Sequence, residues 1–266
     1  MPPAGAQLCV AGIRITDRDR AVLEFVSEHR LVVAAHIQAL LGVSAAVGYA
    51  RLRALTVAGL LDQDQIFHAR PGCYRITRTG LGLVGSKLPR PRIDLRCYDH
   101  DVGVAWLWLA AQRGAFGDLV EVTAERRLRS HDAGQDGRAD PLGVRLGGVG
   151  PGGRARLHYP DLVLTDTGGH RIALELELSS KGRTRLERIL AGYCADARVD
   201  AVVYLTDDLD IARQVRAAAR KVGISPLVHV QKVSFGAAGR PSEGTAAQQR
   251  RRSARRSTDR SGQQTL

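Results

Sequence analysis

The segment from His158 to Lys181, HYPDLVLTDTGGHRIALELELSSK, constrains the fold of this chain more than any other part of it. Two apolar runs flank a turn with two adjacent glycines, a pattern that predicts a β-hairpin. The hairpin carries three carboxylates, Asp161, Glu175 and Glu177, although acidic residues are uncommon in strand interiors. Alternate residues of a strand share a face, so we expect Glu175 and Glu177 to form an acidic face at a sheet edge, opposite an apolar one.

The turn predicts which residues face each other across the hairpin. A three-residue loop at 167–169 pairs Asp166 with His170 and therefore places Asp161 opposite Glu175. Cross-strand partners have Cβ atoms about 5 Å apart, so the acids can converge on one place. Converging carboxylates repel each other unless a cation lies between them, and oxygen ligands favour magnesium or manganese. Such ions can activate water against a phosphodiester.

The same acids also allow an interpretation without a metal. Glu175 and Glu177 could form a solvated strand face paired with arginines such as Arg126 or Arg171, and Asp161 could make a hydrogen bond where the strand begins. The sequence alone is compatible with both a metal-dependent site and an ion-paired surface.

The hairpin lies within a region, 91–236, that we expect to be one domain. The order of the expected elements predicts an α/β (α+β) fold with helices on a mixed sheet. These elements are a helix over 100–112, a strand or strand pair over 118–130, an exposed loop over 130–157, the hairpin, a helix over 183–198, a strand over 200–206, a helix over 207–223 and a last strand over 226–233.

Residues 13–90 form a different pattern, with three helical segments followed by a strand, a Pro71-Gly72 turn and a second strand. This region has a net charge of +5, whereas residues 91–236 have +2, so a polyanionic partner is expected to meet the first region.

Three helices and then a hairpin is the order of a winged helix, and residues 13–90 resemble winged helix-turn-helix DNA-binding domains. The resemblance implies that the third helix enters the major groove of double-stranded DNA and that the wing lies against phosphate. A solvated arginine face and a protein-docking module are the alternatives. The candidate DNA contacts are Ser44, Ala45, Tyr49, Arg51 and Arg53 on the helix, with Arg70 and Arg75 in or near the wing.

The second region resembles the PD-(D/E)xK nuclease superfamily. Pro160-Asp161 stands for the PD, and Glu175-Leu176-Glu177 stands where that family has (D/E)-x-K, with glutamate in the lysine position. The resemblance implies a magnesium- or manganese-dependent DNA-cleaving site, in which Lys181 reaches the acids from the end of the strand. The implied catalytic residues are Asp161, Glu175, Glu177 and Lys181, and the implied metal ligands are Asp161, Glu175 and Glu125.

Residues 15–225 together resemble the replication-relaxation family of actinobacterial plasmids and integrative conjugative elements. The resemblance rests on the order of the motifs, from the winged helix through AERRLR at 124–129 and YPDLVL at 159–164 to LELELSSK at 174–181. It implies a mobile-element replication or transfer protein that binds DNA and carries a nuclease-like domain. The domain could nick DNA, or it could be an inactive domain of a DNA-binding regulator or adaptor. The resemblance is also compatible with contacts to other mobile-element proteins and with a homodimer.

Composition limits the remaining functional classes. The tail, 237–266, is rich in arginine and low in complexity, which predicts disorder. Four scattered cysteines lack CxxC spacing and favour neither a zinc site nor a disulfide framework. The first residues lack the pattern of a secretory signal, and no apolar run approaches the length of a membrane span. We therefore expect a cytoplasmic protein with no membrane partner.

Overall fold

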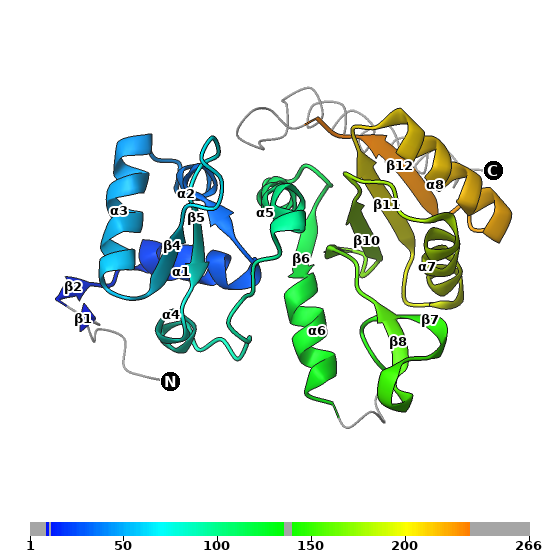
Figure 1. Ribbon diagram of the computed structural model, residues 1–266, viewed down its shortest axis with the longest axis horizontal. Coiled ribbons are helices and arrows are strands. Elements are labelled where there is room, and N and C mark those ends of the chain that lie inside the picture. Colours follow the sequence, from blue (N-terminus) through cyan, green and yellow to red (C-terminus); the bar gives the residue numbers. More distant parts are fainter. Residues whose placement is uncertain (1–8, 11, 136–139, 235–266) are drawn as a thin grey trace, which may run out of the picture. The chain divides into compact units, whose positions relative to one another are not determined.

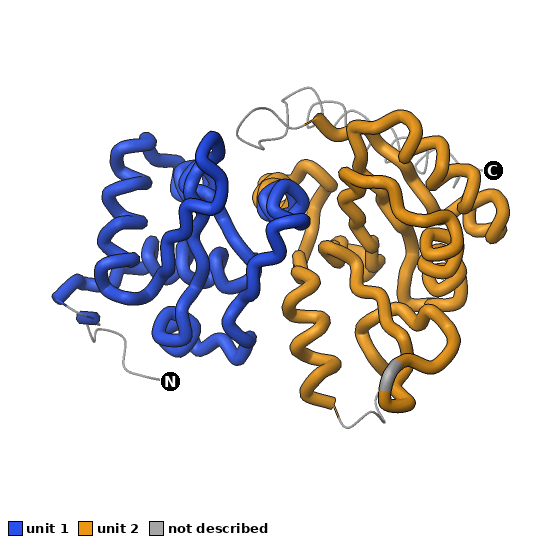
Figure 2. The backbone as a smooth tube through the Cα atoms, in the orientation of Figure 1, with its two compact units in different colours: residues 1–105 blue, residues 106–266 orange. Residues whose placement is uncertain are grey.

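The computed structural model of this 266-residue chain describes residues 9–10, 12–135 and 140–234. The chain divides into two compact units, residues 1–105 and 106–266 (Figure 2). The division falls inside one helix, whereas the sequence had suggested a domain boundary between residues 90 and 91. The arginine-rich tail for which we expect disorder, 237–266, lies outside the described residues.

In its described residues, the first unit combines the helices α1 to α4 with a small antiparallel sheet in which β5 lies between β3 and β4 (Figure 1). The three helices and the hairpin expected over 13–90 are therefore present. The elements of this unit are β1 (Cys9–Val10), β2 (Ile13–Arg14), α1 (Asp17–Glu28), β3 (Val32–Val33), α2 (Ala34–Leu41), α3 (Ala45–Val57), β4 (Leu61–Asp64), β5 (Cys73–Ile76), α4 (Arg78–Leu83) and η1 (Leu95–Cys97).

Local sequence signals account for the ends of these helices. Thr16 and Asp19 form a capping box at the start of α1, with the Thr16 amide donating to Asp19 Oδ2 at 2.7 Å. Gly42 ends α2 in the left-handed conformation, with φ of 65°. Gly80 permits a close approach, because a Cβ at this position would lie 2.4 Å from the Leu60 carbonyl oxygen.

The second unit is built on a five-stranded mixed sheet with the order β12-β11-β10-β9-β6. Strands β10, β11 and β12 run parallel, and β9 is antiparallel to both β10 and β6. The elements are α5 (Tyr98–Gln112), which begins in the first unit, β6 (Leu119–Ala124), α6 (Glu125–Ala133), β7 (Val144–Val149), η2 (Pro151–Gly153), β8 (Ala155–His158), β9 (Leu162–Asp166), β10 (Arg171–Leu176), α7 (Arg183–Ala195), β11 (Ala201–Thr206), α8 (Leu209–Val222) and β12 (Val228–Lys232).

The hairpin formed by β9 and β10 has the predicted register. Asp166 donates its amide to the His170 carbonyl at 3.0 Å, and Leu162 lies opposite Leu174, so the next pair in this register is Asp161 and Glu175. The predicted α/β (α+β) class is also confirmed, since helices accompany a mixed sheet.

Three local predictions were wrong. The predicted strand over 118–130 ends at Ala124, and the next residues form α6, where Glu125 and Arg129 are paired at helical spacing. The exposed loop predicted over 130–157 contains the two-stranded sheet of β7 and β8. The acidic face is not at a lateral edge of the sheet, because β10 is the central strand.

The β7–β8 hairpin was missed because its apolar residues are few and separated by glycines. It packs against α7 at Gly192, where a Cβ would lie 2.7 Å from the Arg145 carbonyl oxygen and 2.8 Å from Val144 Cγ1. A glycine in a distant helix therefore creates the surface on which this hairpin folds, which its own composition does not reveal.

Candidate functional site

The predicted catalytic residues gather where the central strand β10 ends. Glu175 and Ala173 point to the same face of the sheet. The helices α7 and α8 cover this face (Figure 1). The exposed fraction is 2% for Glu175, 5% for Glu177 and 8% for Asp161. These are low values for carboxylates, which are rarely buried without partners. The sequence predicted the shared face of the two glutamates, but not that helices cover it.

Asp161 joins three segments of the second unit. Its Oδ2 accepts the Leu176 amide of β10 at 2.8 Å, which fixes its carboxylate against the central strand. Its carbonyl accepts the Glu125 amide at 3.0 Å, which brings the first residue of α6 to the same place. The side-chain hydrogen bond of Asp161 therefore reaches across to the neighbouring strand β10, and Asp161 lies opposite Glu175 in the hairpin register.

Glu175 accepts two short hydrogen bonds on one oxygen. The Tyr193 hydroxyl of α7 donates to Glu175 Oε1 at 2.5 Å, and His158 Nε2 lies 2.5 Å from the same atom. The rings of Tyr193 and His158 meet edge to face, with centroids 5.8 Å apart. Burial and the adjacent Glu175 carboxylate raise the pKa of Tyr193 well above its usual value, so the phenol remains a donor.

Glu177 and Lys181 form an ion pair beyond the end of β10, as expected if Lys181 reaches back to the acids. Burial raises the pKa of Glu177, and the Lys181 ammonium only partly offsets this effect. Burial alone would lower the pKa of Lys181, but Glu175, Glu177 and Asp161 together outweigh burial and raise it. Lys181 is therefore charged at neutral pH, and all three carboxylates attract its ammonium group.

Tyr204 of β11 adds a buried hydroxyl that sequence analysis missed. Tyr204 lies beside Glu175 in the sheet and is fully buried, yet its hydroxyl has no hydrogen-bond partner among the residues that the structure describes. Burial and the three carboxylates raise its pKa well above the usual value. The only signal in the sequence is a tyrosine within the apolar run AVVYLT, where a polar atom must be buried.

The carboxylates offer the oxygen atoms that magnesium or manganese prefers, but their arrangement does not fit a resident ion. Glu175 Oε1 and Asp161 Oδ2 accept protein hydrogen bonds, and Glu177 is paired with Lys181. Glu125, the predicted third ligand, pairs through Oε1 with Arg129 Nε at 2.6 Å. Within residues 9–10, 12–135 and 140–234, no group of three or more His, Cys, Asp or Glu side chains is placed to hold a metal ion.

The helix predicted to read DNA, α3, presents fewer arginines than its sequence suggests. Ser44, Ala45, Tyr49 and Arg53 are exposed. Arg51 instead turns toward the body of the unit, where it is paired with the buried carboxylate of Asp19 and donates to the Arg14 carbonyl at 3.1 Å.

The two arginines predicted near the wing also have partners in the first unit. Arg75 pairs with Asp64 across the β4–β5 hairpin at 2.7 Å. Arg70 is paired with Asp99 and lies 5.7 Å from the Tyr98 ring centroid. Each of these guanidinium groups already has a carboxylate partner. Arg53 is exposed, and no ion pair joins it to another residue in the described part of the chain.

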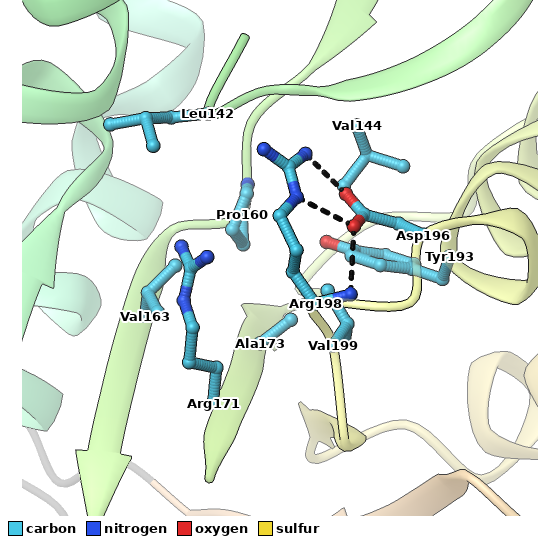
Figure 3. Close-up of a pocket in the computed structure, with 10 residues that line it drawn as sticks. All are labelled: Leu142, Val144, Pro160, Val163, Arg171, Ala173, Tyr193, Asp196, Arg198 and Val199. Atoms are coloured by element: carbon cyan, nitrogen blue, oxygen red, sulfur yellow. Dashed lines mark hydrogen bonds and ion pairs between the residues drawn. The ribbon is translucent and has the colours of Figure 1, made fainter. Parts of the chain in front are cut away.

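A small cavity of about 10 Å³ lies near the start of β10 (Figure 3). Arg198 is one of the polar residues that line it, and its Nη2 pairs with Asp196 Oδ2 at 2.7 Å. The same guanidinium donates to the Pro141 carbonyl at 2.8 Å. The cavity has room for about one water molecule. Arg198 therefore joins the segment before β7 to the end of α7, and the cavity offers no space for a substrate.

No family model, curated protein or solved structure matches this chain. In the part of the chain that the structure describes, no single helix is long and apolar enough to cross a membrane. The bent pair of α2 and α3 meets the length and composition criteria, with 112° between the two helices.

Proposed function

We propose that this protein is a DNA-binding replication or transfer protein of a mobile element. In this proposal the first unit is a winged helix that binds double-stranded DNA, and the second unit is a nuclease-like domain. The observation that carries the proposal is the order of three helices and a hairpin in a basic segment, with an exposed polar side on the third helix. The resemblance to the replication-relaxation family supports the same proposal.

The proposed DNA contacts are Ser44, Tyr49 and Arg53. All three are exposed, and Ser44 precedes the first residue of α3, where a recognition helix enters the groove. Arg51, Arg70 and Arg75 support this surface indirectly, because their ion pairs hold α3 and the hairpin in place.

DNA binding is tested by fluorescence anisotropy with labelled duplexes at several salt concentrations. We expect Arg53→Ala to weaken binding roughly fivefold or more, since one lost arginine contact costs about 1 kcal/mol or more. Arg18→Ala is the matched control, because Arg18 is an exposed arginine that lies on α1 and not on the proposed recognition helix α3. Equal affinities of the two variants would contradict the proposed surface, and binding that is insensitive to salt would contradict DNA binding itself.

A second candidate function is DNA nicking by the second unit with magnesium or manganese. The specific observation that favours it is the placement of Asp161 against β10 opposite Glu175, with Lys181 at the end of the strand. Supercoiled plasmid and either metal test it directly. Nicking that disappears in Glu175→Ala supports the enzyme, whereas no nicking, or nicking that survives this change, leaves the regulator or adaptor function.

A further inference from the structure

The acids at the end of β10 carry a concentration of negative charge that the fold must neutralise. Asp161 and Glu175 are opposite each other in the hairpin register, and Glu177 is two residues beyond Glu175 on the same face. Three buried carboxylates so close together are costly without a positive partner.

Lys181 is a cation that the structure supplies beside these acids. It is ion-paired with Glu177, and only 21% of its side chain is exposed, although lysine side chains are rarely buried. It lies on the short connection between β10 and α7, so the end of the central strand delivers it directly to the acids. Burial opposes its charge, but the attraction of Glu175, Glu177 and Asp161 raises its pKa nonetheless.

We propose that the Lys181 ammonium is the resident cation of this carboxylate cluster and that it excludes divalent metal ions from Asp161, Glu175 and Glu177. The second unit then keeps its fold without metal, and loss of the lysine charge converts the same three acids into a divalent-cation site. The inference deepens the proposed function, because it assigns the regulation of the proposed nuclease-like site to a residue of the chain itself.

The hydroxyl of Tyr204 supports a ligand-binding capacity at this place. It is fully buried on the strand next to Glu175, on the same face, and no group within the described ranges of the chain forms a hydrogen bond with it. A buried hydroxyl without a partner is costly, so a water molecule, free or bound to an ion, would satisfy it.

Two features favour the ammonium over magnesium while Lys181 is present. Magnesium requires nearly ideal octahedral geometry and loses its water reluctantly, whereas an ammonium donates to acceptor oxygens over a wide range of directions. Glu175 Oε1 also accepts two protein hydrogen bonds, from Tyr193 and His158, which an ion would have to disrupt or avoid.

The test compares thermal unfolding of the full chain in EDTA and in MgCl₂ or MnCl₂. Lys181→Met removes the charge and keeps a similar length, and Lys181→Arg keeps the charge. Lys221→Met is the matched control, because Lys221 is an exposed lysine paired with Glu187 at 2.7 Å. We expect Lys181→Met to melt below the wild type in EDTA and to rise by roughly 5 °C at a metal concentration about 100 times its Kd. The other three proteins should shift by less than about 1 °C.

Stabilisation of the wild type by the metal ions as large as that of Lys181→Met would overturn the inference, as would a Lys181→Met protein that gains nothing from them. If Lys181→Met does not fold in EDTA, its folding on addition of MnCl₂ supports the inference and continued unfolding contradicts it. The double variant Lys181→Met/Glu177→Gln removes the pair together, and we expect it to fold without metal.

The lysine inference and the proposed function fail separately. Metal-dependent nicking by the wild type would contradict the lysine inference and leave the nuclease. Absence of salt-dependent DNA binding would contradict the proposed function and leave the metal response of Lys181→Met unaffected.

Discussion

Arg51 is a residue for which the sequence predicts one role and the structure shows another. Its place on the third helix predicts a DNA contact, but its guanidinium is paired with Asp19, whose side chain is 1% exposed. Burial opposes the charge of this carboxyl, yet Arg51 and Thr16 together lower the pKa of Asp19 below its usual value. The pair therefore connects α3 to the capping box of α1.

We expect Arg51→Ala to lower the free energy of unfolding by roughly 3 kcal/mol, because it leaves the buried Asp19 charge without its partner. Urea unfolding followed by circular dichroism measures the change. Arg53→Ala, two residues away and exposed, should change the same quantity by less than about 0.5 kcal/mol. Similar values for the two variants would show that the Asp19 pair contributes little to stability.

At the scale of single elements, the register of the β9–β10 hairpin was predictable and the rest of its surroundings was not. The turn 167–169 and the alternation of acids fix the pairing of Asp161 with Glu175 from local sequence alone. The central position of β10 depends on β11, which is distant in sequence. Likewise, Tyr193 and His158 bond Glu175 only because α7 and β8 fold over it.

The contact between the β7–β8 hairpin and α7 depends on a missing side chain. We expect Gly192→Ala to destabilise the second unit by about 1–3 kcal/mol, because the new methyl group would overlap the Arg145 carbonyl and Val144. Gly182→Ala is the matched control, since nothing lies within 4 Å of its added Cβ and its φ is −58°. Thermal unfolding compares the two, and equal melting temperatures would mean that the hairpin moves aside easily.

At the scale of the whole molecule, carboxyl groups with lowered pKa values occur in both units. Asp19 belongs to the first unit, and Asp132 and Asp196 belong to the second. Arg198 is the main cause of the lowered pKa of Asp196. At Asp132, burial raises the pKa, but hydrogen bonds from the amides of Gly143 and Leu142 and from the side chains of His131 and Tyr159 together outweigh burial.

A carboxyl whose pKa is lower in the folded protein stabilises the fold above its unfolded pKa, and this contribution disappears as the pH falls through the folded value. We therefore expect both units to lose stability between about pH 5 and pH 2. Melting temperatures measured across this range test the prediction, and Asp196→Asn should weaken the dependence. A melting temperature that is constant down to pH 3 would contradict it.

The contacts of residues 98–101 with earlier residues of the first unit have a consequence for the exchange of segments between related chains. The Tyr98 hydroxyl donates to the Pro71 carbonyl at 2.9 Å, Arg70 pairs with Asp99, and Arg30 approaches Asp101 at 3.9 Å. Exchange of residues 1–90 for a foreign segment would separate Pro71 and Arg70 of the hairpin from Tyr98 and Asp99, and would separate Arg30 from Asp101. Functional exchanges should therefore have their crossover points beyond Asp101, so that the segment inherited as one piece is longer than the helices and hairpin alone.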